Sequence, residues 1–500
     1  MGIFKKHFPL GLGTARFPIS GPQDTQGFET AVQIVLRALE LGMDYVDVGH
    51  MYSAGMALHI LREAFHRMDR PFSITAKVQY GIDYTAEDAI GRVEYYLKTL
   101  DVPKAQYFTC WCIWSYADFE KIMAPGGIYD GAKRLQQQGK IDHICASLHA
   151  PPQDIIRIIE SGAFEGITIS YSLLNAAQMR PVLEAAQQRD VSVAVMNPLG
   201  GGVIAQNADY FSFACGDGDE NDTIHAALRF VKSHPAVDIV LSGANSLAEL
   251  KDSFSVFSTP DPQVPADRYQ RVLEQASSLQ GFCTGCKYCD GCPKGIPTHA
   301  IMQARNALLF EPVASYNRQG PEDLLRDLQI FRKLYYDDGW FPETAENPCI
   351  GCGKCERSCT QKLAIIEGVA DIYARAKNRG YHKQAQCDRL KELLYQKGYQ
   401  RVGLYPNGVF TKRILDFYHE CFGEPEFEWI FFNSSSALWG TVDHGHIVHG
   451  PSEIPELRPD IILISTYRYD EEIMDSLHSF AEIGIQIEKL HRESDVPWIF

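Results

Sequence analysis

The chain has 500 residues, of which 45% are hydrophobic and 22% charged, and it carries a formal net charge of −16. This length exceeds one ordinary domain, so we expect about two to four domains that each bury a core. The acidic balance argues against nucleic acid or an anionic membrane as a main partner, because both require a basic surface. The chain has no apolar run long enough to span a bilayer and no secretory signal at its start, which predicts a cytoplasmic protein.

The first half of the chain alternates strand-like apolar runs with amphipathic helical runs, for example at residues 31–41, 87–100 and 179–189. The strand-like runs lie at residues 10–14, 45–48, 73–78, 107–113, 141–147, 166–170, 191–196 and 239–242. This alternation predicts a (β/α)8 barrel over residues 1–265, although other parallel α/β folds share it. A Gly- and Asp-rich segment at 209–222 is expected to be a loop at the active face, and a Pro-rich segment at 259–268 a linker.

Two runs of cysteines lie within residues 266–370, and in each run two residues separate most consecutive cysteines. Three thiolates at this spacing can wrap one iron–sulfur cluster, and the fourth cysteine of each run then ligates the other cluster. The runs predict a ferredoxin-like module with two [4Fe–4S] clusters, around a helix at 321–336. One ligand set is Cys283, Cys286, Cys289 and Cys359, and the other is Cys349, Cys352, Cys355 and Cys292.

Two zinc sites, each with four cysteine ligands, are the alternative, because cysteine pairs at this spacing also bind zinc. Zinc ribbons usually present two separated pairs rather than four successive cysteines, which favours iron–sulfur clusters. The spacing before Cys292 and Thr360 in place of Pro depart from bacterial ferredoxins, so the exchange of the fourth ligands stays open. The other cysteines are expected mostly to pack as small apolar side chains, and they are Cys110, Cys112, Cys145, Cys215, Cys387 and Cys421.

A third domain is predicted over residues 371–500. Helices are expected at 386–397 and 410–421, and strands at 401–405, 429–432 and 460–465. This order predicts a small doubly wound, Rossmann-like α/β domain. Helix-terminus amides after Gly408 could hold phosphate, but the Gly-rich fingerprint is missing, and an interaction or oligomerisation module is an equal alternative. We expect His444, His446 and His449 to lie in a solvated loop rather than at a metal site.

Short motifs follow most of the strands of the first domain. They read LGLGT at 10–14, DVGHMY at 47–52, Lys77, GKI at 139–141 with Ser147, YSLL at 171–174, NPLGGG at 197–202 and LSGAN at 241–245. In this order, over residues 1 to about 365, they resemble the aldo/keto reductase family, in particular its iron–sulfur-containing branch. The resemblance implies NAD(P)H at the C-terminal mouth of the barrel and a catalytic set of Asp, Tyr, Lys and His.

Asp47, Tyr52 and Lys77 match three members of this set. A phenol titrates near about 10, so it is a poor acid at neutral pH. We expect the Lys77 ammonium, held by Asp47, to lower the pKa of Tyr52. Tyr52 then gives a proton to a carbonyl oxygen as hydride arrives, or accepts one in the reverse direction.

The fourth member differs, since Trp114 falls where the resemblance implies His. An indole has one N–H donor and does not titrate, which argues against ordinary reduction of small carbonyls. His50 or His149 is a candidate to substitute. The resemblance further implies that Ser147 lies near the nicotinamide carboxamide. It places the pyrophosphate and adenosine ends of the cofactor at Asn197, Pro198, Leu199, Ser242, Gly243, Ala244 and Asn245.

Some positions depart from the cofactor pattern of the family. Leu148, Thr168 and Ser172 stand where amides are usual, and Cys145 replaces a common Gly. No Arg or Lys directly follows Gly243 to pair a 2′-phosphate, which slightly favours NAD over NADP.

The function expected is an oxidoreductase that couples NAD(P)H and [4Fe–4S] clusters to redox conversion of a carbonyl or hydroxyl substrate, with a sugar-like molecule as one option. The alternatives are a repurposed barrel catalysing dehydration or epimerisation, and a non-catalytic electron-transfer or scaffold protein. We expect a small-molecule substrate and leave a redox partner protein open. The sequence indicates no oligomeric state.

Overall fold

A computed structural model divides the chain into two compact units, Met1–Cys286 and Lys287–Phe500. The structure describes residues 2–68, 70, 72–215, 222–258, 266–277, 281–310, 326–327, 330–331, 333–334, 338–395, 397–408, 411–466 and 470–490. The end of the predicted loop at 209–222, residues 259–265 of the predicted linker and most of the predicted helix at 321–336 lie outside these residues.

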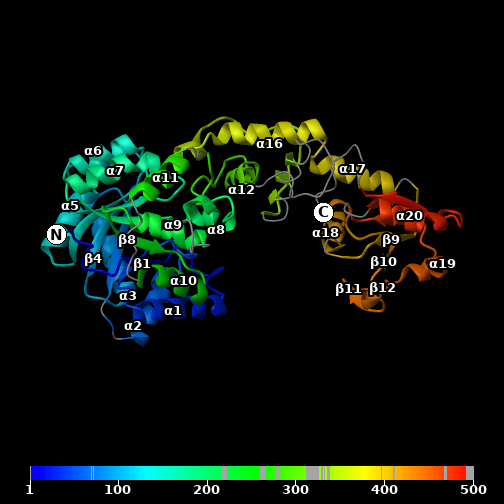
Figure 1. Ribbon diagram of the computed structural model, residues 1–500, viewed down its shortest axis with the longest axis horizontal. Helices are drawn as coiled ribbons and strands as arrows, with labels where there is room; N and C mark the ends of the chain where they lie inside the picture. The colour runs from blue at the N-terminus through cyan, green and yellow to red at the C-terminus, as the bar shows by residue number, and fades with distance from the viewer. Residues whose placement is uncertain are drawn as a thin grey trace. The chain divides into compact units, whose positions relative to one another are not determined.

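Eight parallel strands close a barrel in the first unit, in chain order, with β1 paired to β8 (Figure 1). This confirms the predicted (β/α)8 barrel, and each predicted strand overlaps an observed one. The strands are β1 (Leu10–Gly13), β2 (Tyr45–Asp47), β3 (Ser73–Gln79), β4 (Ala105–Ile113), β5 (Ile141–Leu148), β6 (Gly166–Ser170), β7 (Ser192–Met196) and β8 (Val237–Ser242).

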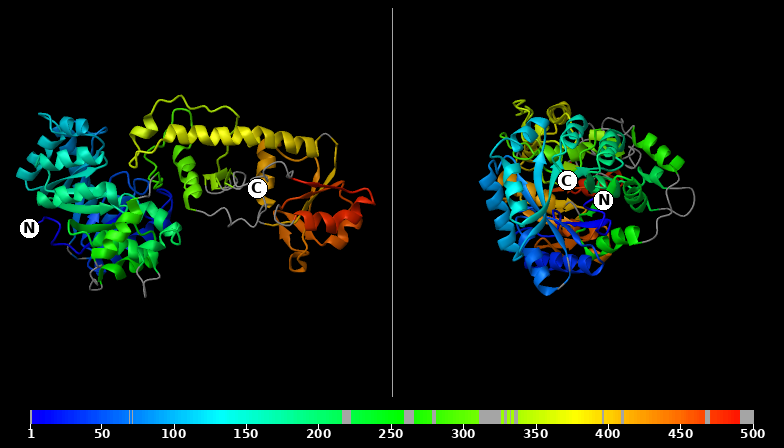
Figure 2. Two further views of the ribbon diagram at one scale, coloured as in Figure 1. Left: turned by 45° about the horizontal axis from the view of Figure 1, so that its top comes forward. Right: turned by 90° about the vertical axis from the view of Figure 1, so that its left-hand side faces the viewer.

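Helices surround these strands (Figures 1 and 2). The longer ones, such as α1 (Thr25–Glu40) and α3 (Ala86–Leu100), bury their apolar residues on one side, as amphipathic helices do. The helix α1 begins before the predicted start at residue 31, because the Asp24 carboxylate caps it by accepting from the N–H of Gly27 at 2.8 Å. The others are α2 (Ala57–Arg67), α3 (Ala86–Leu100), α4 (Tyr116–Ile122), α5 (Ile128–Gln137), α6 (Pro152–Glu160), α7 (Ala176–Gln188), α8 (Val203–Gln206), α9 (Thr223–Lys232), α10 (Leu247–Ser258) and α11 (Ala266–Ser277).

Aromatic side chains fill the N-terminal end of the barrel. The ring of Phe4 is fully buried and lies edge-on to Tyr45 and Tyr107, with centroids 5.3 and 5.2 Å away. A site inside the barrel must therefore open at the other end, where the carboxyl ends of the strands meet. Among the described helices of the chain, none is long and apolar enough to cross a membrane.

The second unit begins with the helices around the later cysteines. These are α12 (Thr298–Arg305), α13 (Ala307–Phe310), α15 (Lys354–Arg357) and α16 (Ile365–Arg379), and α12 packs on α16. The helix α16 continues across residue 370, so it does not mark a boundary there. The predicted division into domains at 1–265, 266–370 and 371–500 stays a prediction.

A six-stranded sheet follows, in the order β11-β12-β10-β9-β13-β14. All neighbours are parallel except β11 and β12, which form a hairpin. The helices α17 (Lys383–Leu394) and α18 (Thr411–Phe422) pack on one face, and α19 (Ile454–Leu457) and α20 (Asp470–Ala481) on the other. The strands are β9 (Arg401–Tyr405), β10 (Glu428–Phe432), β11 (Val442–Asp443), β12 (His446–His449), β13 (Ile461–Ile464) and β14 (Gln486–Lys489).

The predicted phosphate site after Gly408 falls partly on residues 409 and 410, which are outside the described residues. The amide of Gly408 itself donates to the Thr411 hydroxyl at 2.8 Å. A mixed sheet covered by helices on both faces is what the structure establishes here. A Rossmann-like, nucleotide-binding identity stays a prediction.

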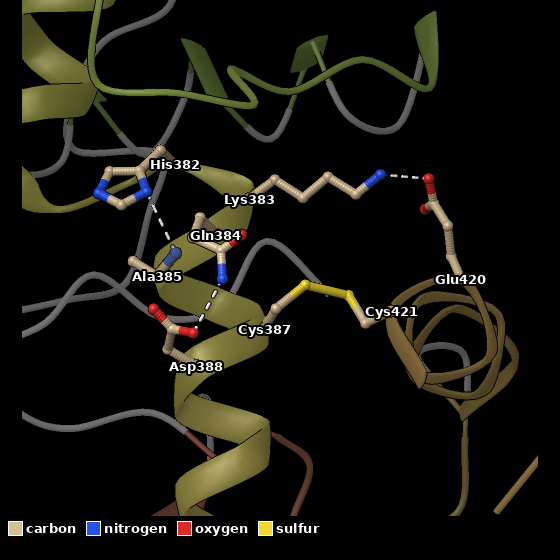
Figure 3. Close-up of a disulfide and its surroundings, with 8 residues drawn as sticks. All are labelled: His382, Lys383, Gln384, Ala385, Cys387, Asp388, Glu420 and Cys421. Carbon is tan, nitrogen blue, oxygen red and sulfur yellow. Dashed lines mark hydrogen bonds and ion pairs between the residues drawn. A yellow bond between two sulfur atoms is a disulfide. The ribbon is translucent and has the colours of Figure 1, made fainter. Parts of the chain in front are cut away.

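A disulfide joins Cys387 on α17 to Cys421 on α18, with Cα atoms 6.1 Å apart (Figure 3). An ion pair between Lys383 and Glu420 lies beside it. The expectation of simple core packing holds for Cys110, Cys112 and Cys145, which are buried in the barrel, but it is wrong for this pair. The two helices pack on the same face of the sheet, which brings the thiols within bonding distance, and spacing along the chain carries no sign of this.

We expect this disulfide to stabilise the second unit. The cysteines are 34 residues apart, and constraining a loop of this length in the unfolded chain contributes about 3 to 4 kcal/mol. Replacing both cysteines with serine should therefore lower the free energy of unfolding of this unit, measured by denaturant titration without reductant. Dithiothreitol should lower the wild-type value to that of the double variant and leave the variant unchanged. Equal stability of the oxidised wild type and the double variant contradicts the prediction.

Candidate active site

Three predicted residues meet at the mouth of the barrel. The Lys77 ammonium on β3 donates to the Asp47 carboxylate at the end of β2, at 2.8 Å, and to the Tyr52 hydroxyl at 2.9 Å. The Asp47 and Lys77 side chains are only 7% and 3% exposed, whereas Tyr52 is partly exposed. The structure thus forms a chain of hydrogen bonds from a buried carboxylate through a buried ammonium to the hydroxyl of a partly exposed tyrosine.

Hydrogen bonds between the first strands hold this group in place. The Thr14 hydroxyl donates to the carbonyl oxygen of Asp47 at 3.0 Å, and the Ser53 hydroxyl to that of Thr14 at 2.6 Å. On the other side, the Thr75 hydroxyl accepts from the N–H of Val48 at 3.0 Å. These contacts fix the backbone on both sides of Asp47 and the turn that carries Tyr52.

Gly49 permits the close approach of the Tyr52 ring. A Cβ atom at Gly49 would lie only 2.9 to 3.1 Å from three ring carbons of Tyr52. Ordinary van der Waals contact needs more room, so a larger residue must displace the ring.

The structure corrects the expected pKa of Tyr52. Burial raises this pKa well above the usual value of 10, and the nearby Asp47 carboxylate acts in the same direction. Removing the phenol proton would place a second negative charge beside Asp47 in a poorly solvated site. In the protein without ligands, Tyr52 is therefore a proton donor rather than a phenolate.

Trp111 lies against this group, and sequence reasoning missed it. Its ring stands perpendicular to that of Tyr52, with centroids 5.3 Å apart, and Lys77 Nζ lies 5.6 Å from its centre. The β3–β4 register pairs Thr109 with Lys77 and Trp111 with Gln79, so these side chains point to the same side. Trp111 could therefore have been found by pairing Lys77 with Thr109 and moving two residues along β4.

Trp114 belongs to a different group. The β4–β5 register shifts after Cys110, and Cys112 has φ of +63°, a bulge of the kind that re-aims side chains. Beyond it, Trp114 packs on His149, with centroids 4.9 Å apart. A ring nitrogen of His149 lies 3.2 Å from the Ser147 hydroxyl. The structure therefore groups Trp114 with the residue predicted to lie near the nicotinamide.

His50 contacts Trp111 edge-on, with ring centroids 6.1 Å apart. Its backbone N–H donates to the Tyr96 hydroxyl at 2.7 Å. Burial lowers the pKa of His50, and the nearby Arg92 adds to this effect, so the ring is neutral at pH 7. The described residues include no hydrogen bond between His50 and Tyr52.

The residues predicted to hold the cofactor ends lie on the loops after β7 and β8. Asn197 has φ of +54°, and the glycines at 200, 201 and 202 have φ of +60°, +74° and +102°. Backbone with such angles presents amides to anions. Pro198, Ser242 and Ala244 are buried, whereas Gly243 and Asn245 are exposed and Leu199 is partly buried.

Arg16, which sequence reasoning did not single out, connects these two loops. Its Nη1 donates to the carbonyl oxygen of Gly201 at 3.0 Å. A Cβ atom at Gly243 would lie 3.4 Å from its Cδ. Arg16 is exposed, so its guanidinium places a positive charge beside these two loops.

Five of the predicted cluster ligands border one hollow in the second unit: Cys289, Cys292, Cys349, Cys352 and Cys355. Much of the remaining wall is apolar, with Ile296, Ile350, Ile366 and Val369. Nearby, the Lys354 ammonium donates to the carbonyl oxygen of Gly291 at 2.9 Å and ties the two cysteine runs together.

The other ligands are placed as follows. Cys359 is buried, and its sulfur accepts from the N–H of Leu363 at 3.4 Å. Cys283 and Cys286 belong to the first compact unit, so the set of Cys283, Cys286, Cys289 and Cys359 stays a prediction from spacing. Within the part of the chain that the structure describes, none of the eight forms a disulfide.

We predict that Gly49→Ala destabilises the barrel by about 1 to 3 kcal/mol, because the new methyl group overlaps the Tyr52 ring. Gly91→Ala is the matched control. Gly91 lies inside α3, and a Cβ there meets no atom within 4 Å, so it should stabilise by up to about 1 kcal/mol. Urea unfolding measures both changes, and equal effects of the two substitutions contradict the contact.

Comparison with known proteins agrees with the barrel. The model of the aldo/keto reductase family matches residues 9–272, just over half of the chain. No curated protein matches the chain.

Several solved structures are similar to 53% of this chain. An aldo-keto reductase from Bacillus halodurans in its holo form is 16% identical, with a TM-score of 0.44 over 91% of its own length. An aldo-keto reductase from Klebsiella pneumoniae in complex with NADPH is 16% identical, with a TM-score of 0.43 over 91% of its length. By the family match, the chain belongs to the aldo/keto reductase family of oxidoreductases.

Proposed function

We propose that the chain reduces a carbonyl, or oxidises the matching hydroxyl, of a small sugar-like substrate with NAD(P)H, and that it carries two [4Fe–4S] clusters. The observation that carries the catalytic part is the chain of hydrogen bonds from Asp47 through Lys77 to Tyr52 at the open mouth of the barrel. This arrangement holds one proton donor at the end of the barrel where the carboxyl ends of the strands meet.

The proton chemistry is assigned to Tyr52. The phenol donates its proton to the carbonyl oxygen, and the Lys77 ammonium stabilises the phenolate left behind through its 2.9 Å contact. Asp47 keeps Lys77 charged and oriented by the 2.8 Å contact. Solvent then returns a proton to Tyr52. NAD(P)H, when bound, supplies the hydride to the carbonyl carbon.

The residues at the mouth fit a nicotinamide dinucleotide. Ser147 is buried at the end of β5 and is assigned to the carboxamide. The glycine run at 200–202 and Arg16 offer amides and a positive charge to the pyrophosphate. Trp111, whose indole does not titrate, lies beside Tyr52, so a single acid serves the reaction.

The cysteine-lined hollow fits an iron–sulfur cluster. Thiols are the ligands that such clusters take, and the four residues assigned to the second cluster, Cys292, Cys349, Cys352 and Cys355, all border it.

The acid role of Tyr52 is tested by its pH dependence. Because its pKa is raised above 10, the phenol keeps its proton as pH rises to about 10. Carbonyl reduction should lose no rate to Tyr52 ionisation up to that pH, and hydroxyl oxidation should speed up as pH rises. Tyr52→Phe should lower kcat by roughly 100-fold or more while NADPH binding is kept. A variant as fast as the wild type, measured by NADPH absorbance with a panel of aldehydes and ketoses, contradicts the role.

The metal content tests the clusters. Protein purified without oxygen should contain about eight iron and about eight sulfide per chain, and its visible absorbance should bleach with dithionite. Cys355→Ser should remove about half of the iron, whereas Cys215→Ser, outside both cysteine runs, should keep all of it. Zinc in place of iron, or no metal at all, refutes the cluster part of the proposal and leaves the barrel chemistry standing.

A further inference from the structure

The segment 282–286, which carries Cys283 and Cys286 and is called the cysteine loop below, packs directly on the loop after β7. A Cβ atom at Gly201 would lie 2.1 Å from the carbonyl oxygen of Thr284 and 3.1 Å from Nη2 of Arg16. Only glycine fits there, because φ is also +74°. Thr284 stands between Cys283 and Cys286 and is 3% exposed. The contact between Gly201 and the Thr284 carbonyl is therefore close, and Thr284 is buried in it.

Arg16 extends the contact to the rest of the cofactor mouth. It donates to the carbonyl oxygen of Gly201 at 3.0 Å, and its aliphatic part lies along Gly243 on the loop after β8. Three loops of the barrel mouth, after β1, β7 and β8, thus meet beside Thr284. These loops carry the residues assigned to the phosphates of the cofactor.

The cysteine loop is an addition to the barrel. The family match ends at residue 272, whereas Thr284 lies beyond it but within the same compact unit, which ends at Cys286. Phe282 and Cys283 are buried as well, with 6% and 7% exposure, so the loop is anchored on the barrel rather than only tethered to it.

We propose that this cysteine loop is a working part of the cofactor site, so that cluster assembly and dinucleotide binding strengthen each other. The inference rests on the proposed function. A cluster bound by Cys283 and Cys286 fixes the Thr284 backbone between them, and Thr284 in turn supports Gly201 and Arg16. Loss of the cluster releases that support. Because coupling between two ligands is reciprocal, a bound dinucleotide must also protect the cluster.

The test measures this coupling in the intact holoprotein. Chelator titrations under anaerobic conditions, each brought to equilibrium, measure how tightly the iron is held with and without saturating NADPH, and again with NADH. We expect the cofactor to raise the chelator concentration that removes half of the iron by roughly 5- to 50-fold. In protein stripped of clusters, the dissociation constant for NADPH should rise by a comparable factor, with circular dichroism confirming that the barrel is folded.

Two neighbouring glycines provide a matched pair of variants. Gly201→Ala places a methyl group on Thr284 and should reduce the coupling to about twofold or less. Gly202 also has a positive φ, of +102°, but a Cβ atom there would meet only the Gln206 side chain, at 3.8 Å. Gly202→Ala should keep the wild-type coupling, whatever it does to affinity itself.

The outcomes separate this inference from the proposed function. Clusters and NADPH that bind independently of each other, or equal coupling in the Gly201 and Gly202 variants, overturn the inference alone. Wild-type protein that holds no iron, or that binds neither NADPH nor NADH, contradicts the proposed function and removes the inference with it.

Discussion

The mouth of the barrel is organised by one buried ion pair, between Asp47 and Lys77. Burying two charges costs several kcal/mol for each ion unless their contact is close and their remaining polar atoms are satisfied. Here the contact is 2.8 Å and Lys77 also donates to Tyr52, whereas Asp47 Oδ1 has no hydrogen-bond partner among the described residues. Removing either charge leaves the other buried without its partner. The position of the Tyr52 hydroxyl therefore depends on the ion pair being intact. Adjacent parallel strands supply both charges, which is why the closed barrel is a precondition for the site.

Much of this arrangement could be predicted from the sequence. Strands buried on both faces of a parallel barrel read as short apolar runs, and all eight are found this way. Asp47 and Lys77 lie near the carboxyl ends of β2 and β3, Tyr52 follows β2, and the barrel brings these strand ends together. The place of Trp114 could not be found from alternation alone, because the bulge at Cys112 shifts the register where β4 ends. The Cys387–Cys421 disulfide and the contact of Thr284 with Gly201 join residues whose closeness depends on packing.

The two units differ in how their chemistry is inferred. Family membership covers the barrel alone, so the chemistry of the second unit depends on its own residues. In the second unit, the spacing of the cysteines along the sequence and the hollow that five of them border both favour ligation by thiols. The raised pKa of Tyr52 is the main change that the structure makes to the expected mechanism, since the phenol stays protonated near neutral pH and holds the proton that carbonyl reduction requires.

The central claim is that hydride and proton meet the same carbonyl group at Tyr52. The most direct measurement supplies NADPH deuterated at the transferring position of the nicotinamide, together with a ketose or aldehyde that the protein turns over. Mass spectrometry of the product alcohol then locates the label. The account predicts deuterium on the former carbonyl carbon with wild-type protein, and none above background with Lys77→Met. Oxidation of the labelled NADPH without deuterium in the product would contradict it.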